Sequence, residues 1–192
     1  MISKNLKCIY IHIPKTGGMS IESMLGEDLK KIHQSSIKIK HGTPKEWKYP
    51  KYWGYYYKFT FVRNPWDRVV SAYLYNLKMS DTNSLQHDRE KIKGYGIDGF
   101  NEYVLNDLQD TKSRFFLPCS NWIKGYKYDF IGKLENFEKD MSFICKKMGI
   151  SYIDTHLNMT KRDKYSNYYN EKAKKIIEHI YRDDISMFNY TF

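Results

Sequence analysis

The sequence lacks several features that would place it in a particular class of proteins. Its cysteines, Cys8, Cys119 and Cys145, do not have the spacing of a metal site or of a disulfide scaffold, so we expect buried thiols. No run of about 18 apolar residues occurs, and the N-terminal segment has no apolar core of the kind that marks a signal peptide. We therefore expect a soluble, cytoplasmic chain without a transmembrane segment.

Several motifs of known chemistry are absent as well. The sequence contains no G-x-x-x-x-G-K-[ST], no H-E-x-x-H and no G-x-S-x-G. These absences argue against an ordinary P-loop, a zinc protease and a serine hydrolase. A nucleotide kinase would also need a Mg²⁺-holding aspartate, which we do not find. We therefore expect a ligand that is bound without a metal ion.

Acidic residues are fewer than basic ones, with 22 Asp and Glu against 32 Lys and Arg and a formal net charge of +10. This excess favours anionic partners, namely nucleotides, nucleic acid, sulfated or acidic glycans, or membrane surfaces, and does not choose among them. Alternatively, the lysines simply form a solvated face. The length of 192 residues and the 41% hydrophobic content predict a single domain over residues 1–192, since no repeat or linker indicates a second.

The segment IYIHIPKTGGMSIESML (9–25) predicts a strand, a glycine turn and a helix. Isoleucines alternate with Tyr10 and His12, Pro14 ends the strand, and Gly26 can end the helix that follows. Amide groups at a helix N-terminus after a glycine turn attract anions, and Lys15 adds a positive charge beside them. The alternative is an ordinary tight turn with a solvated lysine.

A second joint of this kind lies in YKFTFVRNPWDRVVSAYLYNL (57–77). Residues 58–63 read as a strand that ends at Arg63, and Asn64 can cap a helix that starts at Pro65. Ser71 lies off the apolar face of this helix, so core packing does not explain it. The residues predicted on that face are Trp66, Val69, Val70, Tyr73, Leu74 and Leu77.

The rest of the chain continues this alternation of strands and helices. Residues 78–97 and 151–168 read as polar loops, and residues 128–131 read as a strand. Helices are expected after the predicted caps Asp98, Asn136 and Asn170, the second of them ending at Gly149. Such alternation predicts a parallel α/β sheet, in which ligands bind beyond the carboxyl ends of the strands. Lys15 and Arg63 both fall at such ends.

The segments PKTGGMS (14–20) and FVRNPWDRVVSAY (61–73) together resemble the cofactor motifs of the carbohydrate sulfotransferases, the heparan- and chondroitin-like enzymes of sulfotransferase family 2. The resemblance continues in matching order through DFIGKLENFEKD (129–140), HLNMTKRDKYSNYY (156–169) and the Tyr-rich tail. It implies an α/β fold like that of P-loop NTPases, a three-layer sandwich with a central parallel sheet. It also implies transfer of a sulfuryl group from 3′-phosphoadenosine 5′-phosphosulfate (PAPS) to a hydroxyl of a carbohydrate or glycolipid, without a metal.

The resemblance also implies roles for single residues. In the family the first-motif lysine, here Lys15, contacts the 5′-phosphosulfate and its bridging oxygen. Amides and hydroxyls of the loop hold the 5′-phosphate, and the second-motif arginine and serine, here Arg63 and Ser71, bind the 3′-phosphate, as expected for charge-assisted hydrogen bonds. Arg162 and Tyr165 resemble a segment that closes over the nucleotide. The loop residues are Thr16, Gly17, Gly18, Met19 and Ser20, of which Met19 departs from the family's usual hydroxyl residue.

The acceptor hydroxyl must also lose a proton, so a base is needed. His41, in KHGTPKEW (40–47), resembles the family's histidine between the two motifs, which is the base there. Its alternative is a turn residue ahead of Gly42 and Pro44. Glu46 is the reserve candidate, and His12, which points opposite the isoleucines of its strand, reads as structural.

Other functions stay open at this point. A basic module that binds nucleic acid or glycans would explain the charge but not the order of the strand-end sites, so no nucleic-acid partner is expected. A catalytically weakened sulfotransferase would explain Met19. The acceptor cannot be read from residues 30–57 and 78–97, although their aromatic side chains could stack on sugar rings.

Overall fold

The computed structural model describes residues 1–26, 41–46, 50–79, 86–154 and 162–192. The contacts within the chain divide it into two compact units. The first comprises residues 1–63 and 119–159, and the second comprises residues 64–118 and 160–192. The prediction of one domain over residues 1–192 is not tested by this division and stays a prediction.

The first unit is built on a four-stranded sheet in the order β1-β2-β3-β4. β2 pairs with β3 and β3 with β4 in parallel, whereas β1 pairs with β2 in antiparallel orientation. The central strands are therefore parallel, as predicted. The antiparallel edge strand β1 was not predicted and makes the sheet mixed; a short turn suffices to join such antiparallel neighbours. The strands are β1 (Ile2–Ser3), β2 (Cys8–Ile11), β3 (Tyr57–Val62) and β4 (Phe130–Lys133).

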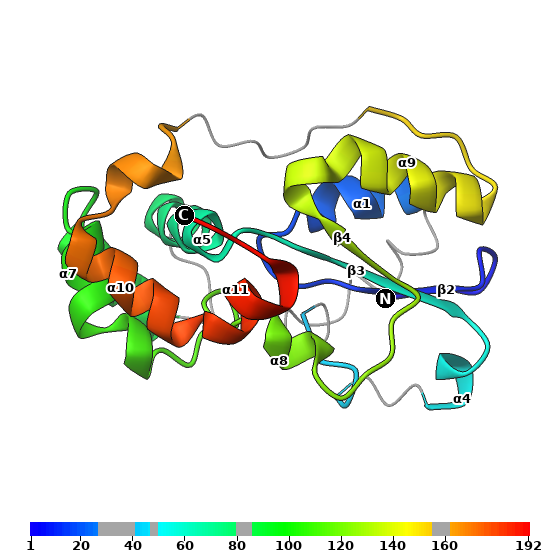
Figure 1. Cartoon of the computed structure of the whole chain (residues 1–192), viewed down its shortest axis with the longest axis horizontal. Helices are drawn as coiled ribbons and strands as arrows, with labels where there is room; N and C mark the ends of the chain where they lie inside the picture. The colour runs from blue at the N-terminus through cyan, green and yellow to red at the C-terminus, as the bar shows by residue number, and fades with distance from the viewer. Residues whose placement is uncertain (27–40, 47–49, 80–85, 155–161) are drawn as a thin grey trace. The chain divides into compact units, whose positions relative to one another are not determined.

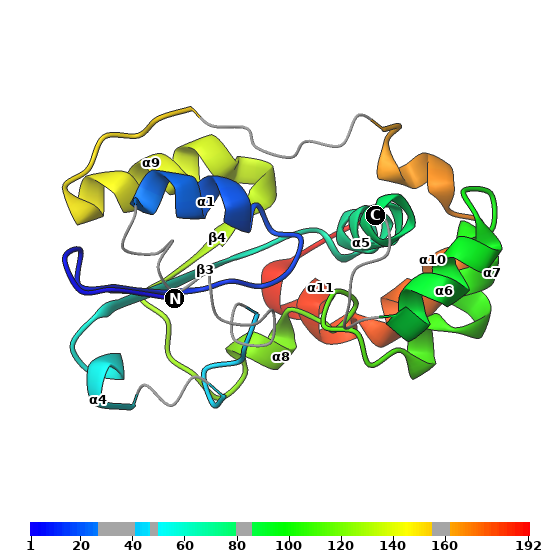
Figure 2. The ribbon, with the colours of Figure 1, turned by 180° about the vertical axis from the view of Figure 1, so that it is seen from behind.

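Helices cover both faces of this sheet. α1 (Gly18–Leu25) and α9 (Phe137–Met148) lie on one side of the strands, and α8 (Ser120–Ile123) lies on the other (Figures 1 and 2). The unit also contains α4 (Pro50–Trp53) and the 3₁₀ turn η3 (Leu134–Asn136). This arrangement confirms the predicted α/β fold. Its core packs between the sheet and the pair α1 and α9 and includes Cys8, Tyr10, Ile21, Phe59, Phe61, Met141, Ile144 and Cys145.

β4 begins later than the sequence pattern predicted, and contacts made just before it explain the shift. The carboxylate of Asp129 accepts a hydrogen bond from the backbone N–H of Lys58 and pairs with its ammonium group, both at 2.8 Å. The hydroxyl of Tyr128 donates to the carbonyl of Trp122 at 2.8 Å. Tyr128 and Asp129, which were predicted to start the strand, therefore make side-chain contacts that fix the chain just before it. Pairing with β3 begins at Phe130.

The second unit is helical in its described part. α10 packs against α7, and α5 packs against α6 and η4. The predicted caps at Asn64 and Asn170 are confirmed, whereas α7 begins after Gly99 rather than after Asp98, and α11 was not predicted. The elements are α5 (Pro65–Lys78), α6 (Gln86–Tyr95), α7 (Phe100–Asn106), η2 (Leu108–Asp110), η4 (Tyr165–Tyr168), α10 (Glu171–Ile180) and α11 (Arg182–Phe188).

α6 corrects the prediction of an irregular loop over residues 78–97, of which residues 80–85 lie outside the described part. Its sequence is polar, and tertiary contacts stabilise it. Ile92 is fully buried, and Nε of Arg89 donates to the side-chain amide oxygen of Asn76. Because most of the stability of a short helix comes from packing, such contacts can outweigh a weak sequence pattern.

Arg68 lies at the centre of this unit and is fully buried. Its guanidinium group donates to the backbone carbonyls of Phe115 and Leu117 and lies over the ring of Tyr181, 5.8 Å from the centroid. A buried charge is tolerated where hydrogen bonds compensate it. Arg68 thereby joins α5 to the segment before α8 and to the end of α10.

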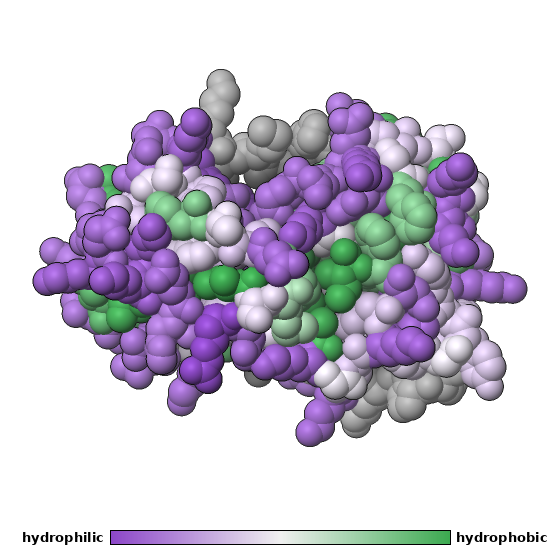
Figure 3. Space-filling model, in the orientation of Figure 1, coloured by the Kyte–Doolittle hydropathy of each residue, from purple (hydrophilic) through white to green (hydrophobic). Residues whose placement is uncertain are grey.

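Hydrophilic side chains predominate on the face drawn in Figure 3, over both units. An apolar area lies over β4 and α9 of the first unit, where Phe143 is 50% exposed and stacks on Phe130 at 5.0 Å. Of the helices in the described ranges, none is both long and apolar enough to span a bilayer.

The cap of α5 gives a test of the second unit. The side-chain oxygen of Asn64 accepts from the N–H groups of Trp66 and Asp67, and its amide donates to the carbonyl of Thr191. Asn64→Ala should lower the free energy of unfolding by about 0.5–2 kcal/mol, measured by urea titration. Asn64→Asp keeps the oxygen that caps the helix, so its free energy of unfolding should fall by less. An equal decrease for both variants would show that the contact with Thr191 dominates.

Candidate functional site

The turn between β2 and α1 has the backbone of a strained anion loop. Lys15 and Gly17 both lie in the left-handed region, with φ values of 68° and 82°. The carbonyl of Gly17 accepts hydrogen bonds from the N–H groups of Ser20 and Ile21 at 3.1 and 3.2 Å and so starts the helix. Left-handed backbone at a lysine is unfavourable, and such strain is common at functional sites.

Some side chains of this loop are buried and stabilise its conformation, whereas Met19 is exposed. Thr16 is fully buried, and its hydroxyl donates to the carbonyl of Ile13 at 2.9 Å. Because that proton is already used, Thr16 would reach an anion through its backbone N–H. Gly17 caps α1 without a side chain, Ser20 is buried, and Met19 is 47% exposed without a side-chain donor. The anion-binding capacity of the loop therefore comes mainly from backbone amides.

Arg63 reaches the same loop from the next strand. β2 and β3 are parallel, with Ile11 opposite Thr60, so the residues that follow both strands emerge at one edge of the sheet. Nη1 of the half-buried Arg63 donates to the backbone carbonyl of Lys15 at 3.1 Å. The structure therefore brings the guanidinium of the second predicted motif against the backbone of the first, within the first unit.

His41 is buried and anchored on two sides. Nδ1 of His41 lies 3.2 Å from the backbone carbonyl of His12. The backbone carbonyl of His41 accepts a hydrogen bond from the indole N–H of Trp122 at 3.0 Å. A carbonyl can only accept, so this contact favours the tautomer with the proton on Nδ1. Nε2 then carries the lone pair that a general base needs. His41 also lies in a turn, as the alternative interpretation expected, and its role as the base stays a prediction.

Glu46, the reserve candidate, is engaged elsewhere. Its carboxylate accepts from the backbone N–H of Thr43 at 2.7 Å and from the hydroxyl of the same residue at 3.0 Å. This pattern is a capping box around an exposed turn. The contact explains the presence of a glutamate here without a catalytic role and favours His41 as the base.

Tyr10 lies behind the loop, fully buried in the sheet. Burial, and then the charge of Glu22, raise the pKa of the Tyr10 phenol well above its usual value. The phenol therefore stays neutral at physiological pH and does not compete as a base. Among the residues that the structure describes, no group of three or more His, Cys, Asp or Glu is placed to hold a metal ion.

The remaining predicted residues belong to the second unit. Ser71 is buried on α5, with 8% of its surface exposed. The guanidinium of Arg162 pairs with the carboxylate of Asp67 in the first turn of α5. The hydroxyl of Tyr165 faces the amide of Asn64 at 3.5 Å. Arg162 is therefore held on α5, the helix that carries Ser71, and the nucleotide-binding roles of these residues stay predictions.

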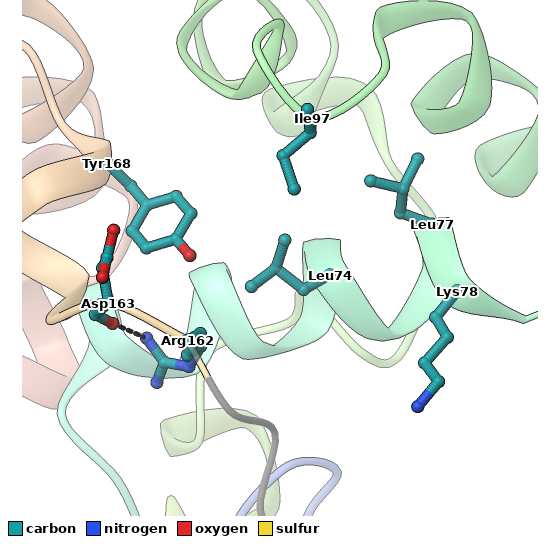
Figure 4. A pocket seen from close by; sticks show the side chains of 7 residues that line it. All are labelled: Leu74, Leu77, Lys78, Ile97, Arg162, Asp163 and Tyr168. Carbon is teal, nitrogen blue, oxygen red and sulfur yellow. Dashed lines mark hydrogen bonds between the residues drawn. The ribbon is translucent and has the colours of Figure 1, made fainter.

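A cavity of about 610 Å³ opens beside α5 within the second unit (Figure 4). Leu74, Leu77 and Ile97 form an apolar side, and Arg162 and Lys78 supply positive charge. The two leucines, predicted in the core face of α5, are only half-buried here because they line this space. The lining combines apolar surface with groups of both charges, because Asp163 also lines the cavity and Arg162 pairs with Asp67. The lining residues are Leu74, Leu77, Lys78, Ile97, Arg162, Asp163 and Tyr168.

Sequence reasoning did not identify Trp122, Glu22 or Asp67 as parts of these sites. Trp122 is 81 positions from His41, and no local pattern links them. Asp67, in the first turn of α5, holds Arg162, which lies 95 positions later in the chain. Glu22 lies four positions after Gly18, a helical spacing that places both residues on one face of α1 and that the sequence could have revealed.

Comparison with known proteins shows the family of this chain. The profile of the sulfotransferase family matches residues 1–191. An uncharacterised protein of Archaeoglobus fulgidus is 34% identical over 113 residues, which are 57% of this chain and 82% of that protein. Carbohydrate sulfotransferase 14 of Danio rerio is 29% identical over 112 residues, 50% of this chain and 30% of the relative. Carbohydrate sulfotransferase 11 of Rattus norvegicus is 25% identical over 205 residues, 88% of this chain and 54% of the relative. The chain thus covers between 30% and 54% of the length of these sulfotransferases.

The indole of Trp122 should matter for His41 beyond its effect on stability. Trp122→Phe leaves the buried carbonyl of His41 without this donor and should cost about 1–3 kcal/mol in the free energy of unfolding. Trp66→Phe is the matched control, because its indole donates to the carbonyl of Lys174 in the second unit. Only Trp122→Phe should also change the ¹⁵N imidazole signals of His41 in NMR spectra. Unchanged signals would mean that Trp122 does not position His41.

Proposed function

Because this chain belongs to the sulfotransferase family, we propose that it transfers a sulfuryl group from PAPS to a hydroxyl group, with a carbohydrate or glycolipid as the acceptor. The observation that carries the proposal is the contact between Arg63 and the backbone of Lys15, next to the N-terminus of α1. Lys15, Arg63 and the amides that precede α1 all follow strands at one edge of the sheet. Such a donor set suits a ligand with separated phosphate groups.

The residues present fit the nucleotide. The amides from Thr16 to Ser20 and the ammonium group of Lys15 would hold the 5′-phosphosulfate, and Arg63 would bind the 3′-phosphate. The resemblance of the motifs also assigns Ser71 to the 3′-phosphate and Arg162 and Tyr165 to the nucleotide, and for these three residues the proposal rests on the sequence alone. Met19 contributes only its backbone N–H, because its side chain has no donor. The charges in the proposal come from side chains, so the proposed reaction includes no metal ion.

Lys15 and His41 have separate tasks in the proposed reaction. PAPS, when bound, supplies the sulfuryl group and an anionic leaving group. The ammonium group of Lys15 stabilises the negative charge that develops on the bridging oxygen. Nε2 of His41 accepts the proton of the acceptor hydroxyl, while the carbonyl of His12 holds the proton on Nδ1. The backbone contact thus keeps the base in its working tautomer.

The names of the relatives support a carbohydrate as the acceptor. Tyr55 is 88% exposed and is available to stack on a sugar ring. Trp53 instead packs against the rings of Tyr126 and Tyr128 at 5.7 and 5.8 Å and reads as structural. Of the aromatic residues considered for sugar contacts, Trp47 and Tyr49 lie outside the described residues.

A catalytically weakened sulfotransferase is the second candidate, because Met19 is 47% exposed where the family usually has a hydroxyl. Such a protein would still bind the nucleotide, and only turnover separates the two. A basic module for nucleic acid rests on the charge of +10 alone and gives no reason for the contact between Arg63 and Lys15.

The cofactor assignment is tested by comparing two nucleotides. Adenosine 3′,5′-bisphosphate should bind about ten- to a hundredfold more tightly than adenosine 5′-monophosphate in calorimetry, because Arg63 and Ser71 lose a charge-assisted partner in the monophosphate. Ser71→Ala should narrow this ratio, whereas Lys146→Ala, on the exposed side of α9, should not. Equal affinity for the two nucleotides would remove the assignment of Arg63 and Ser71.

The catalytic assignment is tested by separate variants of Lys15 and His41. Lys15→Ala should weaken bisphosphate binding and lower turnover, because it removes charge from both the ground state and the transition state. His41→Ala should lower turnover by about 10²–10⁴-fold and leave bisphosphate affinity nearly unchanged. The measurements are calorimetry and transfer of ³⁵S from labelled PAPS to a panel of desulfated glycans. If His41→Ala retains normal turnover, His41 is not the base.

A further inference from the structure

His12 follows β2 and points toward α1, on the face of the sheet opposite the isoleucines. Its side chain is buried and stacks on Tyr10 with ring centroids 5.7 Å apart. Nδ1 lies 2.5 Å from Oε1 of Glu22 in α1, and both side chains are at most 5% exposed. A buried carboxyl group is costly unless a polar partner compensates it. The contact therefore ties the end of β2 to α1.

The opposite edge of the same imidazole lies against the loop of residues 14–20. We call this segment the phosphate loop, because the proposed function assigns the 5′-phosphosulfate to it. A Cβ atom added to Gly18 would lie 1.9 Å from Nε2 of His12 and 2.3 Å from its two neighbouring ring carbons. The ring therefore fills the space that a side chain at position 18 would need. Gly18 is the first residue of α1, so the ring also sets how closely the amides at this N-terminus approach the strand.

His12 contacts the candidate base as well. Its backbone carbonyl lies 3.2 Å from Nδ1 of His41, and the two rings meet edge to face with centroids 4.4 Å apart. One residue thus touches Gly18 in the phosphate loop, Glu22 in the helix behind it, and His41. A histidine that only filled the core would not need to contact both halves of a reaction site.

We propose that His12 and Glu22 form a positioning pair, which holds the amides of the phosphate loop and the imidazole of His41 in a fixed relative geometry. The inference rests on the proposed function and adds residues that act through others. Glu22 orients the imidazole of His12, and that ring supports Gly18 on one side and His41 on the other. Displacements of about 1 Å at reacting groups can cost about a hundredfold in rate, so such support matters for catalysis.

The test is a double-mutant cycle between His12 and Gly18, with calorimetric affinity for adenosine 3′,5′-bisphosphate as the readout at a temperature where each variant is folded. Gly18→Ala alone should weaken binding at least about tenfold, because the new Cβ meets the ring. His12→Ala should weaken binding to a similar extent. In the double variant the Cβ occupies the vacated space, so its affinity should equal that of His12→Ala within about twofold.

A second measurement observes His41 directly and does not need an acceptor or a bound nucleotide. The ¹⁵N imidazole signals of His41 should show the proton on Nδ1 in the wild type, and they should change in His12→Ala. Glu22→Gln keeps the shape of the side chain and replaces His12→Ala in this test if that variant does not fold. It should weaken bisphosphate binding about three- to tenfold and shift the same signals of His41. Ser23→Ala, on the exposed side of α1, and His179→Gln, exposed on α10, are the controls and should match the wild type.

The outcomes separate this inference from the proposed function. Wild-type protein that does not bind the bisphosphate would overturn the proposed function, and the signals of His41 would still decide the role of the pair. Binding by the wild type together with independent, multiplying effects of His12→Ala and Gly18→Ala would overturn the pair alone. Lower thermal stability with unchanged affinity and unchanged His41 signals would show a purely structural role and would also overturn it.

Discussion

The candidate site of the first unit depends on the parallel pairing of β2 with β3. Because both strands run in the same direction, Lys15 and Arg63 follow them at one edge, although they are far apart in the sequence. The guanidinium of Arg63 donates to the backbone carbonyl of Lys15 and so ties the residue that follows β3 to the loop that follows β2. The register of the two strands thus brings two motifs that are 48 positions apart to the same edge.

Backbone groups perform much of the work around this edge. The carbonyl of His12 lies 3.2 Å from Nδ1 of His41, the carbonyl of Gly17 starts α1, and the buried hydroxyl of Thr16 braces the loop through Ile13. These contacts depend on the path of the chain more than on side-chain identity. The backbone N–H of position 19 is present whichever side chain stands there, so the exchange of a hydroxyl residue for Met19 leaves this part of the loop unchanged.

The sequence predicted the elements whose ends carry local signals. Gly26 ends α1, Asn64 and Asn170 cap α5 and α10, and Gly149 ends α9 in the left-handed conformation. α6 was missed because few of its residues are apolar and its stability comes from contacts with other helices. β4 was displaced because Asp129, which looks like part of a strand, pairs with Lys58 instead. Local patterns therefore predicted elements whose ends carry such signals. Contacts between residues far apart in the sequence changed the boundaries of others.

The residues of the candidate site also differ in whether a local sequence pattern reveals them. Lys15, Gly17, Gly18 and Arg63 stand at strand-to-helix joints, where charge and glycine are visible in a short window of sequence. The partners that orient His41 are not visible there, since Trp122 comes from α8 and the carbonyl of His12 carries no sequence signal. Chemistry that needs a particular residue type can thus be predicted before the fold is known. Geometry that needs a particular neighbour cannot, because a contact between distant positions arises only when the sheet brings its strand ends together.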